Sequence, residues 1–184
     1  VQSLEPHVSM DRPSVHSFGT VLLGAIRTDQ GRYEEAREYL DRAWDLHVRA
    51  KSLDHRGYNL QHQGGLAVAQ RDYVSAYSYY TECASLWRRL GGVAMSSLLL
   101  EFCGSTAVAV GRYADAAAHY TDALSVGETA RMESGRGVSG IRLGMVDAAL
   151  GQEDVAEARR HLAIVAPTAF DGGSEQAQAR CIEA

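Results

Sequence analysis

Apolar and small residues recur along the chain at a helical spacing. Between residues 76 and 90 they follow one another at intervals of four, three, four and three, as Ala76, Tyr80, Cys83, Trp87 and Leu90. This spacing places the five side chains on one face of an α-helix. An earlier stripe of the same kind consists of Ala36, Leu40, Ala43 and Val48. No segment alternates apolar and polar residues over the length of a strand, so the pattern predicts helices and no sheet.

The pattern returns every 40 residues. Related segments begin at Gly31 ("GRYEEAREYL"), Arg71 ("RDYVSAYSYY") and Gly111 ("GRYADAAAHY"). Small residues align in three columns, which are Gly24, Gly64, Gly104 and Gly144, then Ala36, Ala76, Ala116 and Ala156, then Ala43, Cys83, Ala123 and Ala163. Each unit is therefore predicted to form a helix, a tight turn at Gly-Arg-Tyr and a second helix. Glycine in the turn allows a positive φ, and glycine in the Gly24 column allows two helices to approach closely.

The fourth unit departs from this pattern. Gly151 continues the turn-glycine column of Gly31 and Gly111, but Glu153 replaces the tyrosine of Tyr33, Tyr73 and Tyr113. A slip of two residues would restore the stripe as Ala158, Leu162 and Val165. Pro167 predicts an early end of that helix, because the residue before proline avoids the α region. Ser174 could cap a further helix that begins at residue 175.

The paired helices resemble a known repeat. Leu23-Gly24 and Leu143-Gly144, each followed by G-x-Y-x-x-A-x-x-x-[LY]-x-x-A or a variant of it, are similar to the tetratricopeptide (TPR) signature over residues 15 to 166. The usual unit has about 34 residues. The 40-residue spacing resembles the longer variety found in bacterial signal-transduction regulators, and "AYSYYTECASLWRRLGG" is similar to arrays attached to STAND ATPases and to LuxR-type or SARP-type activators.

This resemblance implies an all-α fold, a right-handed superhelix of antiparallel helix pairs (an α-solenoid). The expected units are residues 15–54, 55–94, 95–134 and, irregularly, 135–174. Residues 1–14 form an N-terminal segment, for which the end of a preceding helix is one interpretation, and residues 175–184 begin a fifth pair. Neither end has the polar character of a solenoid cap, so we expect an excerpt of a longer array or an end that pairs with another chain.

Composition and charge narrow the classes of function. The formal net charge of -5 disfavours a nucleic-acid surface, which needs clustered cations. No apolar run approaches the length of about 20 residues that a bilayer requires, and the N-terminus has no secretion signal. Cys83, Cys103 and Cys181 have no metal-ligand or disulfide spacing, so we expect reduced thiols and a cytoplasmic protein.

Motifs that could carry chemistry are isolated. "GRGVSG" at Gly135 matches the dinucleotide fingerprint, but no strand is predicted before it. His55 and His62 could share a helix face without a further ligand at metal spacing. No nucleophile, base and orienting group can be assembled, and Trp44 and Trp87 fit core positions. We therefore expect no cofactor, no metal and no enzymatic activity.

The resemblance also implies where a ligand would bind. In TPR proteins the ligand contacts the first helix of each pair, and the matching positions form three columns. They are Phe18, Tyr58, Leu98 and Val138, then Val21, Gln61, Glu101 and Ile141, then Ala25, Gly65, Ser105 and Met145. Phe18 and Tyr58 are the candidate anchors. Alternatively, these columns pack against the next turn of a longer superhelix.

The expected function is a non-enzymatic module that binds a protein or peptide, within the sensor or scaffold region of a larger bacterial transcriptional or signal-transduction regulator. A small-molecule inducer is a further candidate ligand. The alternative is a self-association arm that forms a homodimer. On the first hypothesis, Tyr58→Ala with Glu101→Ala weakens partner binding and leaves the melting temperature nearly unchanged.

Overall fold

Eight α-helices account for the described part of the chain. The computed structural model describes residues 13–129 and 136–170, with side chains for 17–127 and 138–166. The helices are α1 (Pro13–Asp29), α2 (Tyr33–Arg49), α3 (Leu53–Ala69), α4 (Tyr73–Arg89), α5 (Val93–Ala109), α6 (Tyr113–Thr129), α7 (Arg136–Gly151) and α8 (Val155–Phe170). Within these ranges there is no strand, as the periodicity predicts.

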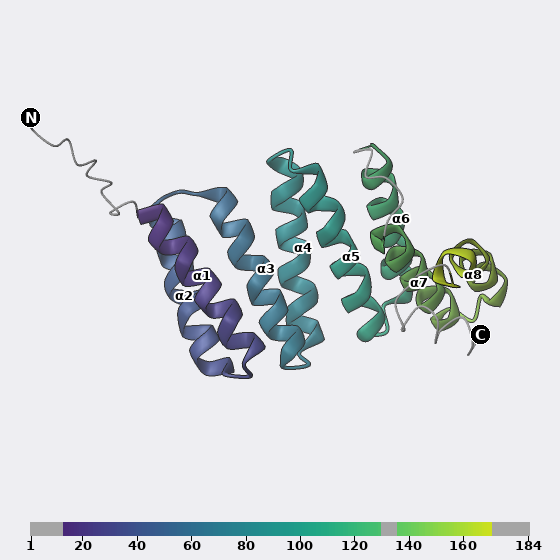
Figure 1. Cartoon of the computed structure of the whole chain (residues 1–184), viewed down its shortest axis with the longest axis horizontal. Helices are drawn as coiled ribbons and strands as arrows, with labels where there is room; N and C mark the ends of the chain where they lie inside the picture. The colour runs from purple at the N-terminus through teal and green to yellow at the C-terminus, as the bar shows by residue number, and fades with distance from the viewer. Residues whose placement is uncertain (1–12, 130–135, 171–184) are drawn as a thin grey trace, which may run out of the picture.

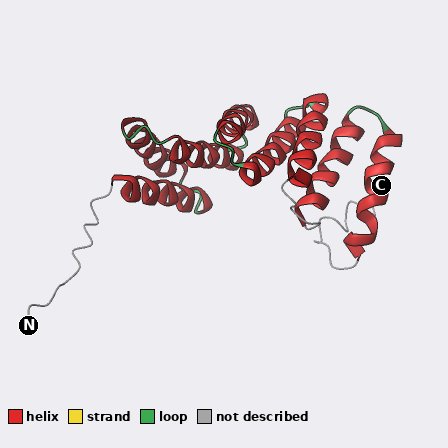
Figure 2. Ribbon diagram, turned by 90° about the horizontal axis from the view of Figure 1, so that it is seen from above, coloured by secondary structure: helices red, strands yellow, loops and turns green. Residues whose placement is uncertain are grey.

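The helices pack in consecutive pairs along one row (Figure 1). The first helix of each pair contacts the second, and each second helix contacts the first helix of the next pair. Seen from above, the helix axes change direction from the N-terminal pairs to the C-terminal ones (Figure 2). The predicted α-solenoid is therefore confirmed. The helix pairs span residues 13–49, 53–89, 93–129 and 136–170, where the sequence predicts units at 15–54, 55–94, 95–134 and 135–174. The predicted helix at 175–184 and most of the 1–14 segment lie outside the described residues.

The turn within each pair has one repeated geometry. Its central residue has positive φ and is Gly31, Arg71, Gly111 or Glu153. The following backbone N–H donates to the carbonyl five residues earlier, as from Arg32 to Arg27 and from Asp154 to Ala149, both at 2.9 Å. This is the Schellman termination of a helix. The assignment of Gly151 to this column is wrong, because Gly151 is the last residue of α7, which ends two residues later in the repeat than the other first helices, and Glu153 takes the left-handed position.

The two-residue slip in the fourth unit is confirmed. Ala158 and Val165 are buried, whereas Ala156 and Ala163, the residues in strict 40-residue register, are exposed. The later end of α7 delays the turn by two residues, so the buried stripe of α8 moves with it. The expected early end before Pro167 is wrong: α8 runs to Phe170. The helix continues for only three residues beyond Pro167, so the proline lies in its last turn.

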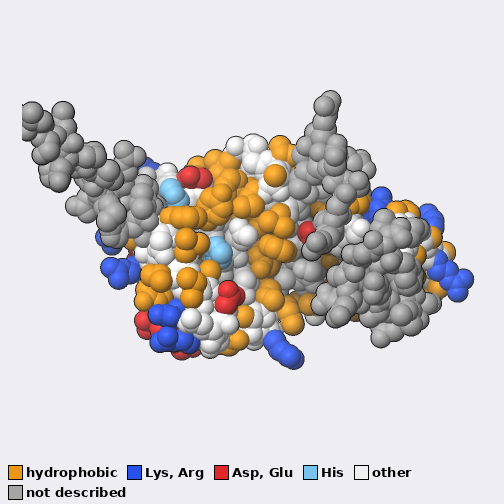
Figure 3. All heavy atoms as spheres, viewed as in Figure 1, with side chains coloured by type: hydrophobic (Ala, Val, Ile, Leu, Met, Phe, Trp, Pro, Cys, Tyr) orange, Lys and Arg blue, Asp and Glu red, His pale blue; other side chains and the backbone are white. Residues whose placement is uncertain are grey.

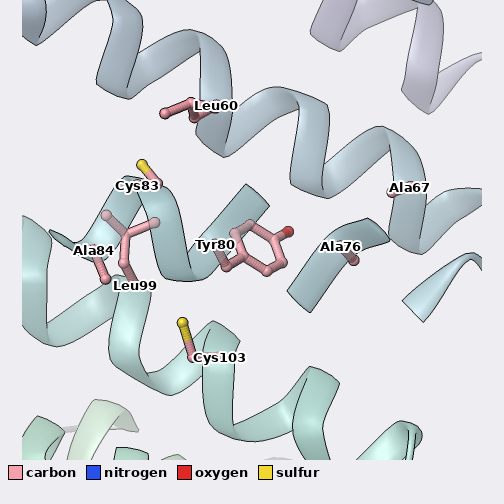
Figure 4. Close-up of a cluster of buried hydrophobic side chains, with 8 residues drawn as sticks. All are labelled: Leu60, Ala67, Ala76, Tyr80, Cys83, Ala84, Leu99 and Cys103. Atoms are coloured by element: carbon pink, nitrogen blue, oxygen red, sulfur yellow. The ribbon is translucent and has the colours of Figure 1, made fainter. Parts of the chain in front are cut away.

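The core lies between the helices of neighbouring pairs and is continuous along the row. Figure 4 shows its central cluster, in which Leu60 and Ala67 come from α3, Leu99 and Cys103 from α5, and Ala76, Tyr80, Cys83 and Ala84 from α4 between them. Every member of this cluster is buried. Each pair thus shelters its apolar side only with help from its neighbours, which is the physical basis of a solenoid.

The first glycine column marks where helices approach most closely. A Cβ on Gly24 would lie 2.8 Å from Leu40 Cγ, one on Gly64 would lie 2.5 Å from Tyr80 Cε1, and one on Gly104 would lie 2.6 Å from Tyr120 Cε1. Gly144 also meets Tyr120, which belongs to the preceding pair. Only glycine fits at these crossings without a shift of the neighbouring side chain.

Candidate binding face

The predicted binding columns lie on α1, α3, α5 and α7, the first helices of the four pairs. On the face seen in Figure 3, hydrophobic side chains gather over the part of the molecule that α1 to α5 occupy in Figure 1. In the first column, Phe18, Tyr58 and Val138 are half-buried and Leu98 is exposed. An apolar face of this kind is a candidate interaction surface.

The two candidate anchors touch each other. The rings of Phe18 and Tyr58 meet edge to face with centroids 5.7 Å apart, and Tyr58 meets Trp87 in the same way at 5.1 Å. Tyr58 therefore joins α1 to α4 through α3. Such aromatic pairs contribute about 0.5–1.5 kcal/mol beyond the area that they bury. The structure brings the anchors together, but it gives Tyr58 a structural role that the sequence did not reveal.

The second column divides into core and surface. Val21 is buried in a cluster with Ala36, Leu40 and Ala43, and Ile141 is buried in a cluster with Leu100 and Ala148. Neither side chain can reach a ligand, so we remove both from the candidate site. Gln61 and Glu101, in the same column, are half-buried.

The third column is small and open. Ala25, Gly65 and Met145 are half-buried, and Ser105 is exposed, with its hydroxyl donating to the Phe102 carbonyl oxygen at 3.0 Å. Because Ala25, Gly65 and Ser105 are small, they leave the backbone of α1, α3 and α5 accessible from this face, whereas Met145 has a long side chain.

A cavity of 460 Å³ opens between α5 and α7. From α5 it is lined by Glu101, Phe102, Ser105, Val108 and Ala109. From α7 it is lined by Gly140, Leu143, Gly144 and Asp147, with Tyr120 of α6 behind them. The cavity joins Glu101 and Ser105, which the sequence predicted, to α7 residues that it did not. The Gly140–Gly144 spacing of four, one turn apart on a helix, was the available signal.

Glu101 is a half-buried acid at the edge of this cavity. Its Oε1 lies 3.2 Å from the position that a Cβ on Gly140 would occupy, so the carboxylate reaches across to α7. Burial raises the pKa of Glu101. No described residue donates a hydrogen bond to this carboxylate or forms an ion pair with it. A half-buried anion without a partner loses hydration and receives nothing in exchange.

Two further cavities lie away from the predicted columns. One of 380 Å³ is enclosed by the ends of α4, α5 and α6 and includes Arg88, Ser96, Leu100 and Asp122. Another of 270 Å³ lies between α2, α3 and α4 and includes Arg37, Gln63 and Tyr79. Neither contains a residue of the three columns.

The described residues assemble no metal cluster or dinucleotide site. Over these residues no three His, Cys, Asp or Glu side chains gather as metal ligands. The glycines at 137 and 140 of "GRGVSG" lie within α7, and Gly135 lies outside the described ranges. Among the helices of 13–129 and 136–170, none has both the length and the apolar character to cross a bilayer.

Comparison with known proteins supports the fold alone. The chain is similar to the crystal structure of BtubC (BKLC) from P. vanneervenii, with a TM-score of 0.79 and 16% sequence identity. The similarity covers 90% of this chain and 68% of that one. No protein-family model and no curated protein matches the sequence. The similarity in fold, at this low identity, agrees with a helical repeat.

Proposed function

We propose that this chain is a non-enzymatic TPR-type module that binds a peptide or an extended protein segment on its first-helix face. The observation that carries the proposal is the cavity between α5 and α7, which combines predicted contact residues with backbone left accessible by glycine. Its 460 Å³ is within the range of ligand sites and exceeds the volume of a single side chain. A protruding side chain of an extended peptide therefore fits it.

The repeat packing supports the TPR assignment. Gly24, Gly64 and Gly104 each approach the residue 16 positions later in the partner helix of the same pair. The small residues of the second helix, Ala36 and its equivalents Ala76 and Ala116, are fully buried. These are the positions that carry the resemblance in sequence, and they play equivalent roles in successive pairs.

The two described cysteines support a role without covalent chemistry. Cys83 and Cys103 are buried, and burial raises the pKa of each thiol to about 12. Since the thiolate is the reactive form, neither is a nucleophile at neutral pH. We place the module in the cytoplasm, within a larger bacterial transcriptional or signal-transduction regulator; this context rests on the resemblance of residues 76–92 to the arrays of such proteins.

Peptide selection tests the proposal directly. Random displayed peptides are selected on the chain, and the enriched ones are measured by calorimetry against two variants. Ser105→Trp fills the cavity from an exposed position, while Ser78→Trp places the same side chain on an exposed position of α4. We expect the enriched peptides to bind Ser78→Trp as tightly as the unmodified chain and to bind Ser105→Trp at least about tenfold more weakly. Equal binding to both, or no enrichment, contradicts the proposal.

A second candidate function, self-association, is favoured by one feature of α1. Ile26 is 47% exposed, while the residues at its position in α3, α5 and α7 are 5%, 3% and 4% exposed, namely Leu66, Thr106 and Val146. Leu66 is covered by the preceding helix pair, in a cluster with Ala36, Leu40 and Ala43, whereas Val146 packs with Ala149 and Ala158 of its own pair. Leu22 and Leu23 extend the exposed stripe. The same face is buried at the equivalent positions of α3, α5 and α7. The exposed apolar face of α1 is therefore suited to packing against another helix, for example α1 of another copy.

Sedimentation velocity separates this candidate from the first. Self-association predicts a sedimentation coefficient that rises with concentration and that Ile26→Glu returns to the monomer value. Val74→Glu, on an exposed position of α4, is the matched control and leaves association intact. A monomer at all concentrations excludes the self-association arm and leaves peptide binding untouched.

A further inference from the structure

The cavity between α5 and α7 has the chemistry to select one class of side chain. We propose that it takes a basic side chain, lysine or arginine, of the bound peptide and that the Glu101 carboxylate pairs with it. This inference rests on the proposed peptide-binding function and makes it specific.

The cavity is lined by negative charge and by no positive charge among the described residues. Among the described residues that line it, the only charged side chains are those of Glu101 and Asp147, and both are acidic. Asp147 lies on the same stripe of α7 as Gly140, seven residues later and so roughly 10 Å further along the helix. An acidic or phosphorylated group placed beside Glu101 would be repelled by its carboxylate, whereas a cation is attracted by it.

The position of Glu101 is suited to a charge-assisted hydrogen bond. Its carboxylate lies at the α5–α7 junction, next to the Cα of Gly140, and it is half-buried. A carboxylate in this setting has already lost part of its hydration, so an entering ammonium or guanidinium group restores interactions that water no longer supplies. The absence of a side chain at Gly140 leaves the space beside the Oε1 atom open.

The remaining walls fit the aliphatic part of a basic side chain. Phe102, Val108 and Leu143 are apolar, and the Tyr120 ring lies behind them. Lysine and arginine bury their methylene stems against apolar surface while their heads remain polar. The cavity therefore offers apolar walls for the stem and a carboxylate for the head.

Three amino-acid derivatives with unbranched aliphatic stems serve as probes. N-acetyl-lysine methylamide, N-acetyl-arginine methylamide and the neutral N-acetyl-norleucine methylamide are titrated into the ¹⁵N-labelled chain, and backbone amide shifts are followed. We expect saturable shifts at Gly140 and Gly144 with the two cations, and binding of norleucine about fivefold or more weaker. Glu101→Gln removes this preference, and Asp122→Asn, in the separate cavity beside Arg88, keeps it.

Each other outcome overturns the inference. Equal binding of norleucine shows a cavity that selects shape and not charge. No shift with any probe shows that the cavity does not accept such a side chain. A lower melting temperature for Glu101→Gln shows that the carboxylate already pairs with a cation of this chain. The peptide selection uses none of these probes, so the proposed function stands or fails separately.

Discussion

The ring of Tyr80 lies directly against Gly64. A Cβ on Gly64 would stand 2.5 Å from Tyr80 Cε1 and 2.8 Å from Cζ, closer than carbon atoms pack. The adjacent Gly65 is different, since a Cβ there would find only the Tyr80 hydroxyl, at 3.9 Å. Two neighbouring glycines of α3 therefore serve different purposes, the first allowing helices to cross and the second leaving the binding face open.

Alanine substitutions at these two positions have opposite effects. Gly64→Ala forces α3 away from Tyr80 and lowers the free energy of unfolding by roughly 1–3 kcal/mol. Gly65→Ala meets no clash and gains helix propensity, which raises it by about 0.5–1 kcal/mol. Urea denaturation of both variants measures the difference. Equal effects at the two positions would contradict the close approach at Gly64.

The turn within each pair provides a reciprocal test. Arg71 has φ of 60° at the position where Gly31 and Gly111 have φ of 71° and 76°. A left-handed conformation costs a residue with a side chain roughly 1–2 kcal/mol. We expect Arg71→Gly to stabilise the chain by about 1 kcal/mol, part of the relief being offset by the freedom of glycine in the unfolded state. Gly111→Arg should destabilise it by a similar amount in the same denaturation assay.

Acid destabilises the junction between α2 and α3. His47 is fully buried, neither ring nitrogen has a hydrogen-bond partner among the described residues, and its ring stacks on His55 at 5.3 Å. Burial, and then the charge of His55, lower the pKa of His47, although Asp54 opposes this. Because the folded pKa lies below the unfolded value, this contribution to stability is complete above about pH 6.5 and is lost as the pH falls below it.

Urea denaturation between pH 8 and pH 5 measures this loss. His47→Leu is expected to flatten the fall in unfolding free energy below pH 6.5 but not to abolish it, because burial also lowers the pKa of His62 and of His119. An unchanged pH dependence in His47→Leu would exclude His47 as a source of the acid sensitivity.

Tyr58 needs a revised test. The sequence-based hypothesis expects Tyr58→Ala to leave the melting temperature nearly unchanged. Since Tyr58 packs between Phe18 and Trp87, we now expect this substitution to lower the free energy of unfolding by about 2–3 kcal/mol. Tyr58→Phe keeps the ring contacts and should melt like the unmodified chain. Thermal denaturation of the two variants distinguishes an anchor of the fold from a free binding residue.

The candidate site was predictable only in part. Glu101 and Ser105, which the TPR resemblance places in the ligand-contacting columns, both line the cavity. Val21 and Ile141 share a column with Glu101 and are nevertheless buried. The exposure of a column residue depends on how the neighbouring pair is rotated, and the spacing of residues along one chain carries no information about that rotation.

The sequence by itself determined the helices, their pairing and the turns of the first three units. Helical periodicity and small residues at fixed intervals act over a few turns, and the 40-residue spacing repeats them, so each is readable locally, whereas the left-handed position of Glu153 in the fourth unit was not. Only the tertiary structure decided where a cavity opens on the first-helix face. The cavity exists because α7 approaches α5 at Gly140 and α6 at Gly144, and the Glu101 carboxylate, which has no partner among the described residues, meets α7 about 40 residues further along the chain.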